Sequence, residues 1–107
     1  MIRFWTESPQ VLLNKFKELI NQSEPKGRIN TWEEHKDGFR HTAKDWKETG
    51  LMVPVIADDK KSLYFKMTVV KDEYAYAYYH GHLLQTFIEH LSKHFKSANF
   101  ADTRTKK

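Results

Sequence analysis

The sequence predicts a small α+β domain in which an antiparallel sheet of four to five strands is flanked by an N-terminal and a C-terminal amphipathic helix, both packed on one face. Three observations predict it: an apolar stripe at helical spacing near each end of the chain, alternating apolar residues in the middle, and polar turn sequences between them. The expected order is therefore one helix, four strands, an optional fifth strand and a second helix.

The N-terminal helix is expected to begin at Ser8-Pro9, where the Ser8 side chain can cap the helix and Pro9 suits its first position. Apolar residues then recur every three or four positions, which predicts a buried stripe. They are Val11, Leu12, Leu13, Phe16, Leu19 and Ile20. The polar stretch 22–27, with its proline and glycine, ends the helix.

Two hairpins are expected in the middle of the chain. Asp37-Gly38 separates two β-capable runs and favours a tight turn, because both residues tolerate positive φ. The second hairpin joins 51–57 to 62–70 through the polar turn 58–61, and its second strand alternates clearly. Pro54 cannot donate a ladder hydrogen bond, so its strand is expected to lie at an edge or to be interrupted there.

The stretch YAYAYY, 74–79, fits two structures. A strand puts Tyr74, Tyr76 and Tyr78 on one face, whereas a helix spreads the tyrosines around its axis. Asp72-Glu73 would suit a helix N-terminus. The strand is the preferred interpretation, with a helix starting near Gly81 and an apolar stripe following at helical spacing.

Charge is distributed unevenly. The net charge is +4, yet residues 1–92 carry 13 basic and 13 acidic side chains, and residues 93–107 carry five basic and one acidic. We therefore expect a single electroneutral domain over 1–100 and a basic, flexible tail over 101–107, with a solvated composition from Ser97 onward. An electroneutral body disfavours a surface that tracks phosphates.

The chain has no cysteine, which excludes disulfides, cysteine-ligated zinc and a thiol nucleophile. The opening residues lack the apolar segment of a secretion signal, and no apolar run approaches the ~20 residues that span a bilayer. A cytoplasmic protein with no membrane partner is expected.

Four of the six histidines fall between residues 80 and 94. His90 and His94 are one helical turn apart, a spacing compatible with zinc, but Glu89 precedes the pair instead of following its first histidine. Histidines at the boundary of the core are therefore favoured over a metal site, and neither a metal nor a cofactor is expected. A pocket built from this segment would use His80, His82, His90, His94 and Tyr79.

Aromatic residues make up 14% of the chain, and some lie outside the clear apolar stripes. Aromatic side chains are enriched in the centres of protein interfaces, because each removes a large area from water. A strand at 74–79 would expose a row of tyrosines. The candidate interaction face is Tyr74, Tyr76, Tyr78 and Trp32.

The function favoured by these observations is a small non-catalytic protein-interaction domain, of a regulator, adaptor or toxin-neutralising type, which binds a protein partner or a second copy of itself. One alternative is a single-stranded nucleic-acid binder that stacks bases on the tyrosines and uses the basic tail. Another is a small-molecule or metal-binding enzyme that uses the histidine pocket.

Overall fold

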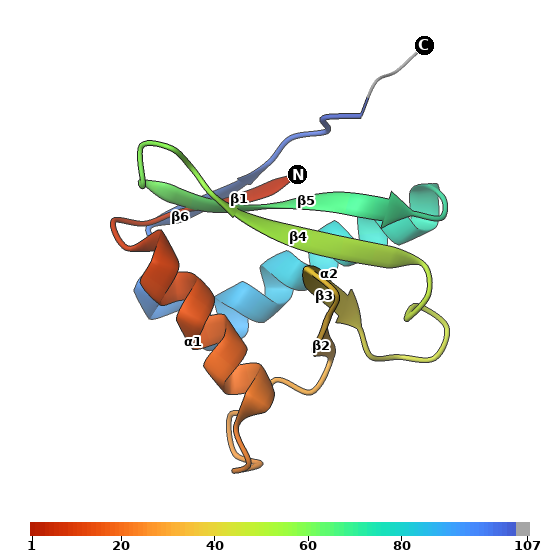
Figure 1. Ribbon diagram of the computed structural model, residues 1–107, viewed down its shortest axis with the longest axis horizontal. Coiled ribbons are helices and arrows are strands. Elements are labelled where there is room, and N and C mark those ends of the chain that lie inside the picture. Colours follow the sequence, from red (N-terminus) through yellow and green to blue (C-terminus); the bar gives the residue numbers. More distant parts are fainter. Residues whose placement is uncertain (105–107) are drawn as a thin grey trace.

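The computed structural model describes residues 1–104 and shows an α+β fold with an antiparallel sheet (Figure 1). In chain order the elements are β1 (Ile2–Trp5), α1 (Pro9–Asn21), β2 (Trp32–His35), β3 (Gly38–His41), β4 (Gly50–Ile56), β5 (Ser62–Val70), α2 (Glu73–Leu91), the short 3₁₀ helix η1 (Ser92–His94) and β6 (Ser97–Phe100). Across the sheet the strand order is β2-β3-β4-β5-β1-β6. The α+β class with an antiparallel sheet and two helices is confirmed, but the described residues form six strands where four to five were expected.

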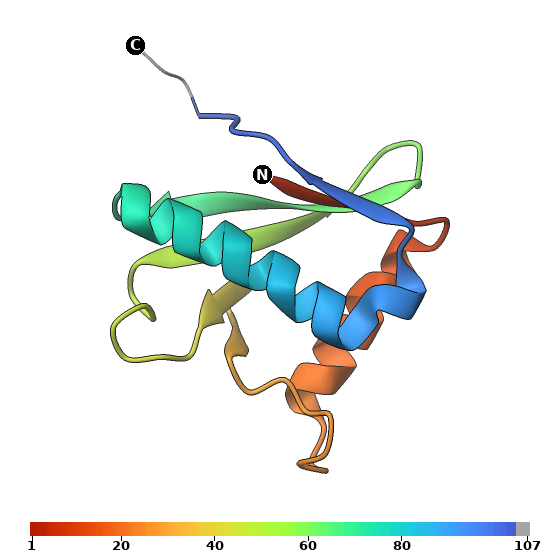
Figure 2. The ribbon, with the colours of Figure 1, turned by 180° about the vertical axis from the view of Figure 1, so that it is seen from behind.

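Both helices pack against the same face of the sheet. The Phe65 ring of β5 lies 6.0 Å from the Phe16 ring of α1 and 5.7 Å from the Phe87 ring of α2, between ring centroids. One inward-facing side chain therefore contacts both helices. Figures 1 and 2 show the helices beneath β1, β4 and β5, and β2 and β3 at the same level as the helices.

The predicted element order is wrong at both ends, because the chain starts and finishes with strands. Ile2 of β1 pairs with Phe65 of β5 on one side and with Phe100 of β6 on the other. Both terminal strands are only four residues long. Each is stabilised by a partner far away in the sequence, so a local pattern carries little trace of it.

Helix α1 begins at Pro9 as predicted, and its buried side chains include Leu12, Leu13 and Phe16. The expected cap differs, because the Ser8 side chain makes no capping hydrogen bond. The Ser8 backbone N–H instead donates to Thr6 Oγ1 at 3.2 Å.

The first hairpin is shifted by one residue from the prediction. Lys36 and Asp37 form the turn, Lys36 takes a φ of 54°, and Gly38 already pairs with His35. A Cβ atom on Gly38 would lie 2.5 Å from the Met52 carbonyl oxygen. This glycine therefore permits the close approach of β3 to β4 and does not serve the turn.

The hairpin of β4 and β5 is confirmed, with Pro54 opposite Phe65. Strand β3 pairs with β4 at Phe39 and Met52, so Pro54 lies beyond that contact. Strand β4 lies between β3 and β5, so the expectation of an edge strand is wrong, but the missing N–H of Pro54 interrupts no observed pairing between β3 and β4.

Residues 74–79 are helical, so the preferred strand interpretation is wrong. Asp72 caps the helix, and its Oδ1 accepts a hydrogen bond from the Ala75 N–H at 2.9 Å. Ala75, Tyr76 and Tyr79 are buried. These three residues lie on one face of a helix, whereas a strand would have buried alternate residues.

Candidate functional site

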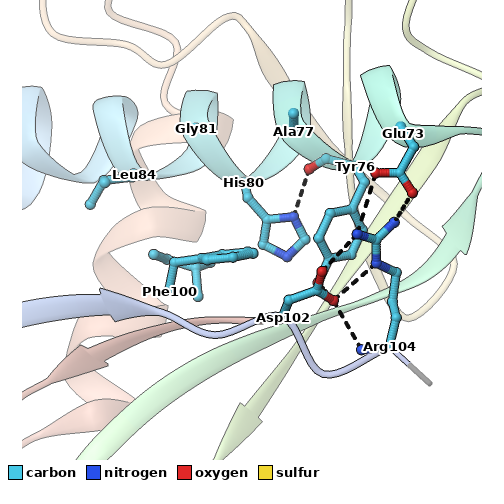
Figure 3. A pocket seen from close by; sticks show the side chains of 10 residues that line it. Glu73, Tyr76, Ala77, His80, Gly81, Leu84, Phe100, Asp102 and Arg104 are labelled. Carbon is cyan, nitrogen blue, oxygen red and sulfur yellow. Dashed lines mark hydrogen bonds and ion pairs between the residues drawn. The ribbon is translucent and has the colours of Figure 1, made fainter. Parts of the chain in front are cut away.

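A groove of about 390 Å³ lies between the N-terminal half of α2 and the edge strand β6 (Figure 3). We call it the α2–β6 groove. Its lining combines apolar side chains with five ionisable ones, namely Glu73, Tyr76, His80, Asp102 and Arg104. The lining residues are Ile2, Glu73, Tyr76, Ala77, His80, Gly81, Leu84, Phe100, Asp102 and Arg104.

One end of the groove is closed by Arg104, which follows β6. Its guanidinium carbon lies 3.7 Å from the centroid of the Tyr76 ring. The same group donates to Asp102 Oδ2 at 2.7 Å and to Glu73 Oε1 at 2.7 Å, and these two acidic partners raise the pKa of Arg104. The pairs join the C-terminal segment to the first turn of α2.

His80 is the polar group inside the groove wall, with 4% of its surface exposed. Its Nδ1 lies 2.7 Å from the Tyr76 carbonyl oxygen, which can only accept, so Nδ1 carries the proton. The other nitrogen, Nε2, is a buried acceptor without a hydrogen-bond partner in the described part of the chain. Burial lowers the pKa of His80, which favours the neutral ring.

Gly81 lies in the middle of α2 and lines the groove. A Cβ atom added there would meet no atom within 4 Å. Glycine inside a helix costs roughly 0.5–1 kcal/mol relative to alanine. The folded chain itself therefore gives no packing reason for a glycine at this position.

A second cluster of rings lies between α2 and the β3–β4 connection. The His41 and His82 rings are 4.6 Å apart, and Tyr78 stacks on Trp46 with centroids 4.0 Å apart. The Ala43 N–H donates to His41 Nδ1 at 3.0 Å. Burial and the neighbouring His82 lower the pKa of His41 to about 4. Both imidazoles are thus held neutral in a mainly aromatic environment.

The histidines of the expected pocket do not converge. His80 lines the α2–β6 groove, whereas His82 faces the second cluster. Tyr79 is buried beside the second cluster, where its hydroxyl donates to the Trp46 carbonyl at 2.7 Å and accepts from the His41 N–H at 3.2 Å. His90 is exposed, and His94 lines a separate depression near α1.

The residues of the expected interaction face are also separated, because 74–79 is helical. Tyr74 is 79% exposed, Tyr76 is covered by Arg104, and Tyr78 is stacked on Trp46. Trp32 belongs to the core, where its Nε1–H donates to Thr86 Oγ1 at 3.0 Å. These four side chains share no continuous surface.

The face of the sheet opposite the helices carries its own aromatic group. The guanidinium carbon of Arg3 lies 4.6 Å from the Tyr64 ring centroid and 5.3 Å from that of Trp5. The Trp5 Nε1–H donates to Asn99 Oδ1 at 2.9 Å. This second surface, 38% exposed at Trp5, provides a control region for the groove.

Sequence reasoning named His80 and Tyr76, in two separate candidate sites, but missed the other residues of the groove. Phe100, Asp102 and Arg104 reach it only because β6 pairs with β1, which lies at the other end of the chain. Gly81 did carry a local signal, since a glycine inside a helical pattern calls for an explanation. The strand interpretation of 74–79 instead places the start of the helix near this glycine.

Neither a protein-family model, nor a curated protein, nor a solved structure matches this chain. Over residues 1–104, no group of three or more histidine, aspartate or glutamate side chains is arranged to hold a metal ion. Within the same range, no helix has the length and apolar character needed to cross a bilayer.

Proposed function

We propose that this protein is a non-catalytic protein-interaction domain whose partner docks in the α2–β6 groove. The observation that carries the proposal is the groove itself, an apolar hollow beside an exposed strand, lined by Leu84, Ala77 and the half-exposed Phe100. Apolar surface of this kind lowers the free energy of a complex when a partner removes it from water.

The ionisable groups of the groove support binding over catalysis. Arg104 is committed to Glu73 and Asp102, and His80 is held as a neutral acceptor. A general base must reach the proton that it removes, and the acceptor nitrogen of His80, Nε2, is covered by neighbouring atoms in this structure.

The arrangement of the tyrosines removes the main support for the nucleic-acid alternative, because Tyr76 and Tyr78 are engaged with Arg104 and Trp46. A cytoplasmic location and binding to a second copy of the chain stay predictions. The basic, flexible tail predicted for 101–107 lies partly outside the described residues, because the structure does not describe 105–107.

The test is a selection of displayed random peptides of about 12 residues on the purified protein. Bound peptides are then measured against Gly81→Trp, in which the new ring occupies space that the fold leaves open. Glu18→Trp, at an exposed position of α1, is the matched control. Circular dichroism establishes that both variants fold.

The proposal predicts peptides that bind wild type and Glu18→Trp alike and lose at least tenfold in affinity for Gly81→Trp, because a filled groove excludes the partner. Peptides that bind all three proteins equally but fail on Trp5→Ala would move the interaction to the opposite face of the sheet. A selection that yields no specific peptide would contradict the proposed function.

A further inference from the structure

We infer that the partner segment in the α2–β6 groove is an extended strand that adds to the edge of β6 and directs a tyrosine or tryptophan side chain toward His80. This inference rests on the proposed function and specifies the chemistry of the partner. Three features carry it: the pairing of β6, the space above Gly81 and the unused acceptor of His80.

The outer edge of β6 has backbone groups available for another strand. Ala101 donates its N–H to the Met1 carbonyl and receives a hydrogen bond from the N-terminal amine, so residues 1 and 101 form a hydrogen-bonded pair. The alternation of an antiparallel ladder then makes Phe4↔Ala98 and Ile2↔Phe100 non-hydrogen-bonded pairs. The N–H and C=O groups of Ala98 and Phe100 consequently point away from β1.

The two edges of the sheet differ in charge. The β2 edge carries Glu33 and Glu34, charges of the kind that discourage pairing with another strand. The β6 sequence, Ser-Ala-Asn-Phe, has no charge and no proline. Of the two edges, β6 is therefore the one suited to accept a partner strand.

An added strand would lie about 4.8 Å from β6, with alternate side chains directed toward α2. On that side Ala77 and Gly81 are small and exposed, and Leu84 adds apolar surface. Ile88, one turn beyond Leu84, is 53% exposed and extends the apolar stripe. A docked partner would explain the glycine at position 81, because a side chain here would block the close approach of the partner strand.

The hydrogen bonding of His80 defines the anchor side chain. Nε2 is an acceptor with no donor among residues 1–104, so the matching group carries an N–H or O–H donor. The Phe100 ring stands edge-on to His80 with centroids 5.1 Å apart and is 49% exposed, and the inference requires this ring to turn aside when the partner side chain reaches Nε2. A planar indole or phenol fits the apolar walls and supplies that single donor.

The charges of the groove argue for an uncharged anchor. Among the described lining residues the cationic side chain is Arg104, and it is already paired with the carboxylates of Glu73 and Asp102. A buried lysine or glutamate of the partner would be desolvated without a free counter-ion at that end. A neutral aromatic group with one donor avoids this cost.

The first experiment characterises the peptides that depend on the groove. We expect them to share a tyrosine or tryptophan within an alternating β-forming stretch. In amide exchange, saturating peptide should slow the Ala98 and Phe100 amides at least tenfold, whereas the Asn99 amide, which already faces β1, changes less. Groove-dependent peptides with only aliphatic anchors, or without protection at 98 and 100, would overturn the inference and leave the proposed function standing.

The second experiment isolates the hydrogen bond to His80. Indole and benzofuran have nearly the same shape, and only indole carries an N–H donor. We expect indole to bind wild type about tenfold more tightly than benzofuran, and His80→Phe to remove that preference. Equal affinity of both compounds for wild type would exclude His80 as the anchor partner, a result that does not depend on the variant folding.

A second copy of the chain is the competing occupant. Sedimentation across a range of concentrations decides this: a monomer that binds the selected peptides agrees with the inference. A dimer that the peptides or Gly81→Trp dissociate would replace the foreign strand with self-pairing through β6, and would overturn it.

Discussion

The guanidinium carbon of Arg104 lies over the Tyr76 ring, 3.7 Å from its centroid, while the guanidinium pairs with Asp102 and Glu73. Tyr76 also donates its hydroxyl to Asp102 Oδ1 at 3.3 Å. The segment after β6 is thereby attached to the start of α2, and it forms one end of the groove. The C-terminal residues thus combine a stabilising contact with a part of the candidate site.

Removal of this contact should loosen the C-terminal segment. We expect Arg104→Ala to lower the melting temperature by a few degrees and to speed exchange of the Ala101 amide, which donates to Met1. Arg104→Lys should recover only part of the loss, because an ammonium cannot form the planar contacts to both acids. Thr103→Ala, at an exposed neighbour, is the control, and an unchanged Ala101 amide in Arg104→Ala would contradict the expectation.

Gly81→Ala should stabilise the protein by about 0.5–1 kcal/mol, because alanine removes the helix cost of glycine and its Cβ meets no atom. Gly38→Ala should do the opposite, since its Cβ would press on the Met52 carbonyl. Urea unfolding measures both free energies. A destabilised Gly81→Ala would mean that the helix needs the glycine for its own structure, and would weaken the argument for a partner.

Thr86, a buried residue of α2, links this helix to Trp32 of β2. Its hydroxyl accepts from Trp32 Nε1–H at 3.0 Å and donates to the His82 carbonyl at 2.9 Å. Thr86→Val keeps the shape but leaves the buried indole N–H unpaired, at an expected cost of about 1–3 kcal/mol. Exchange of the Trp32 indole proton should quicken in Thr86→Val and remain slow in Thr86→Ser. Equal exchange rates in the two variants would contradict this assignment.

Stability should fall as the pH drops from 6.5 toward 4. Burial lowers the pKa of His41 from 6.5 to about 4, so in that window the unfolded state binds more protons than the folded state. The contribution of neutral His41 to stability is complete above pH 6.5, the pKa in the unfolded state, and declines as the pH falls below it. Burial lowers the pKa of His80 and His82 in the same direction.

Urea midpoints between about pH 5 and pH 7 measure this slope, in a range where carboxylates contribute less. His41→Gln, whose amide oxygen can still accept from Ala43, should flatten the curve relative to wild type. A variant with the wild-type slope would show that other groups carry the pH dependence.

Local pattern determined the parts of the fold whose residues are neighbours in the chain. The stripe from Leu12 to Phe16 defined α1, and alternation around Phe65 defined the β4–β5 hairpin. Asp72 also gave a readable cap for α2. The alternation of tyrosine and alanine nevertheless favours a strand over 74–79, because period-two spacing cannot be assigned to a helix or a strand while the buried partners are unknown.

Tertiary structure alone decided the terminal strands and the groove. Four-residue segments such as Ile2–Trp5 and Ser97–Phe100 become strands through pairing with each other and with β5, and pairing energy has no local sequence signature. The groove depends on that pairing, because it brings Phe100 and Arg104 beside His80 and Gly81. The sequence by itself therefore determined α1, the C-terminal half of α2 and the central hairpins, whereas contacts between distant segments determined which side chains share a site.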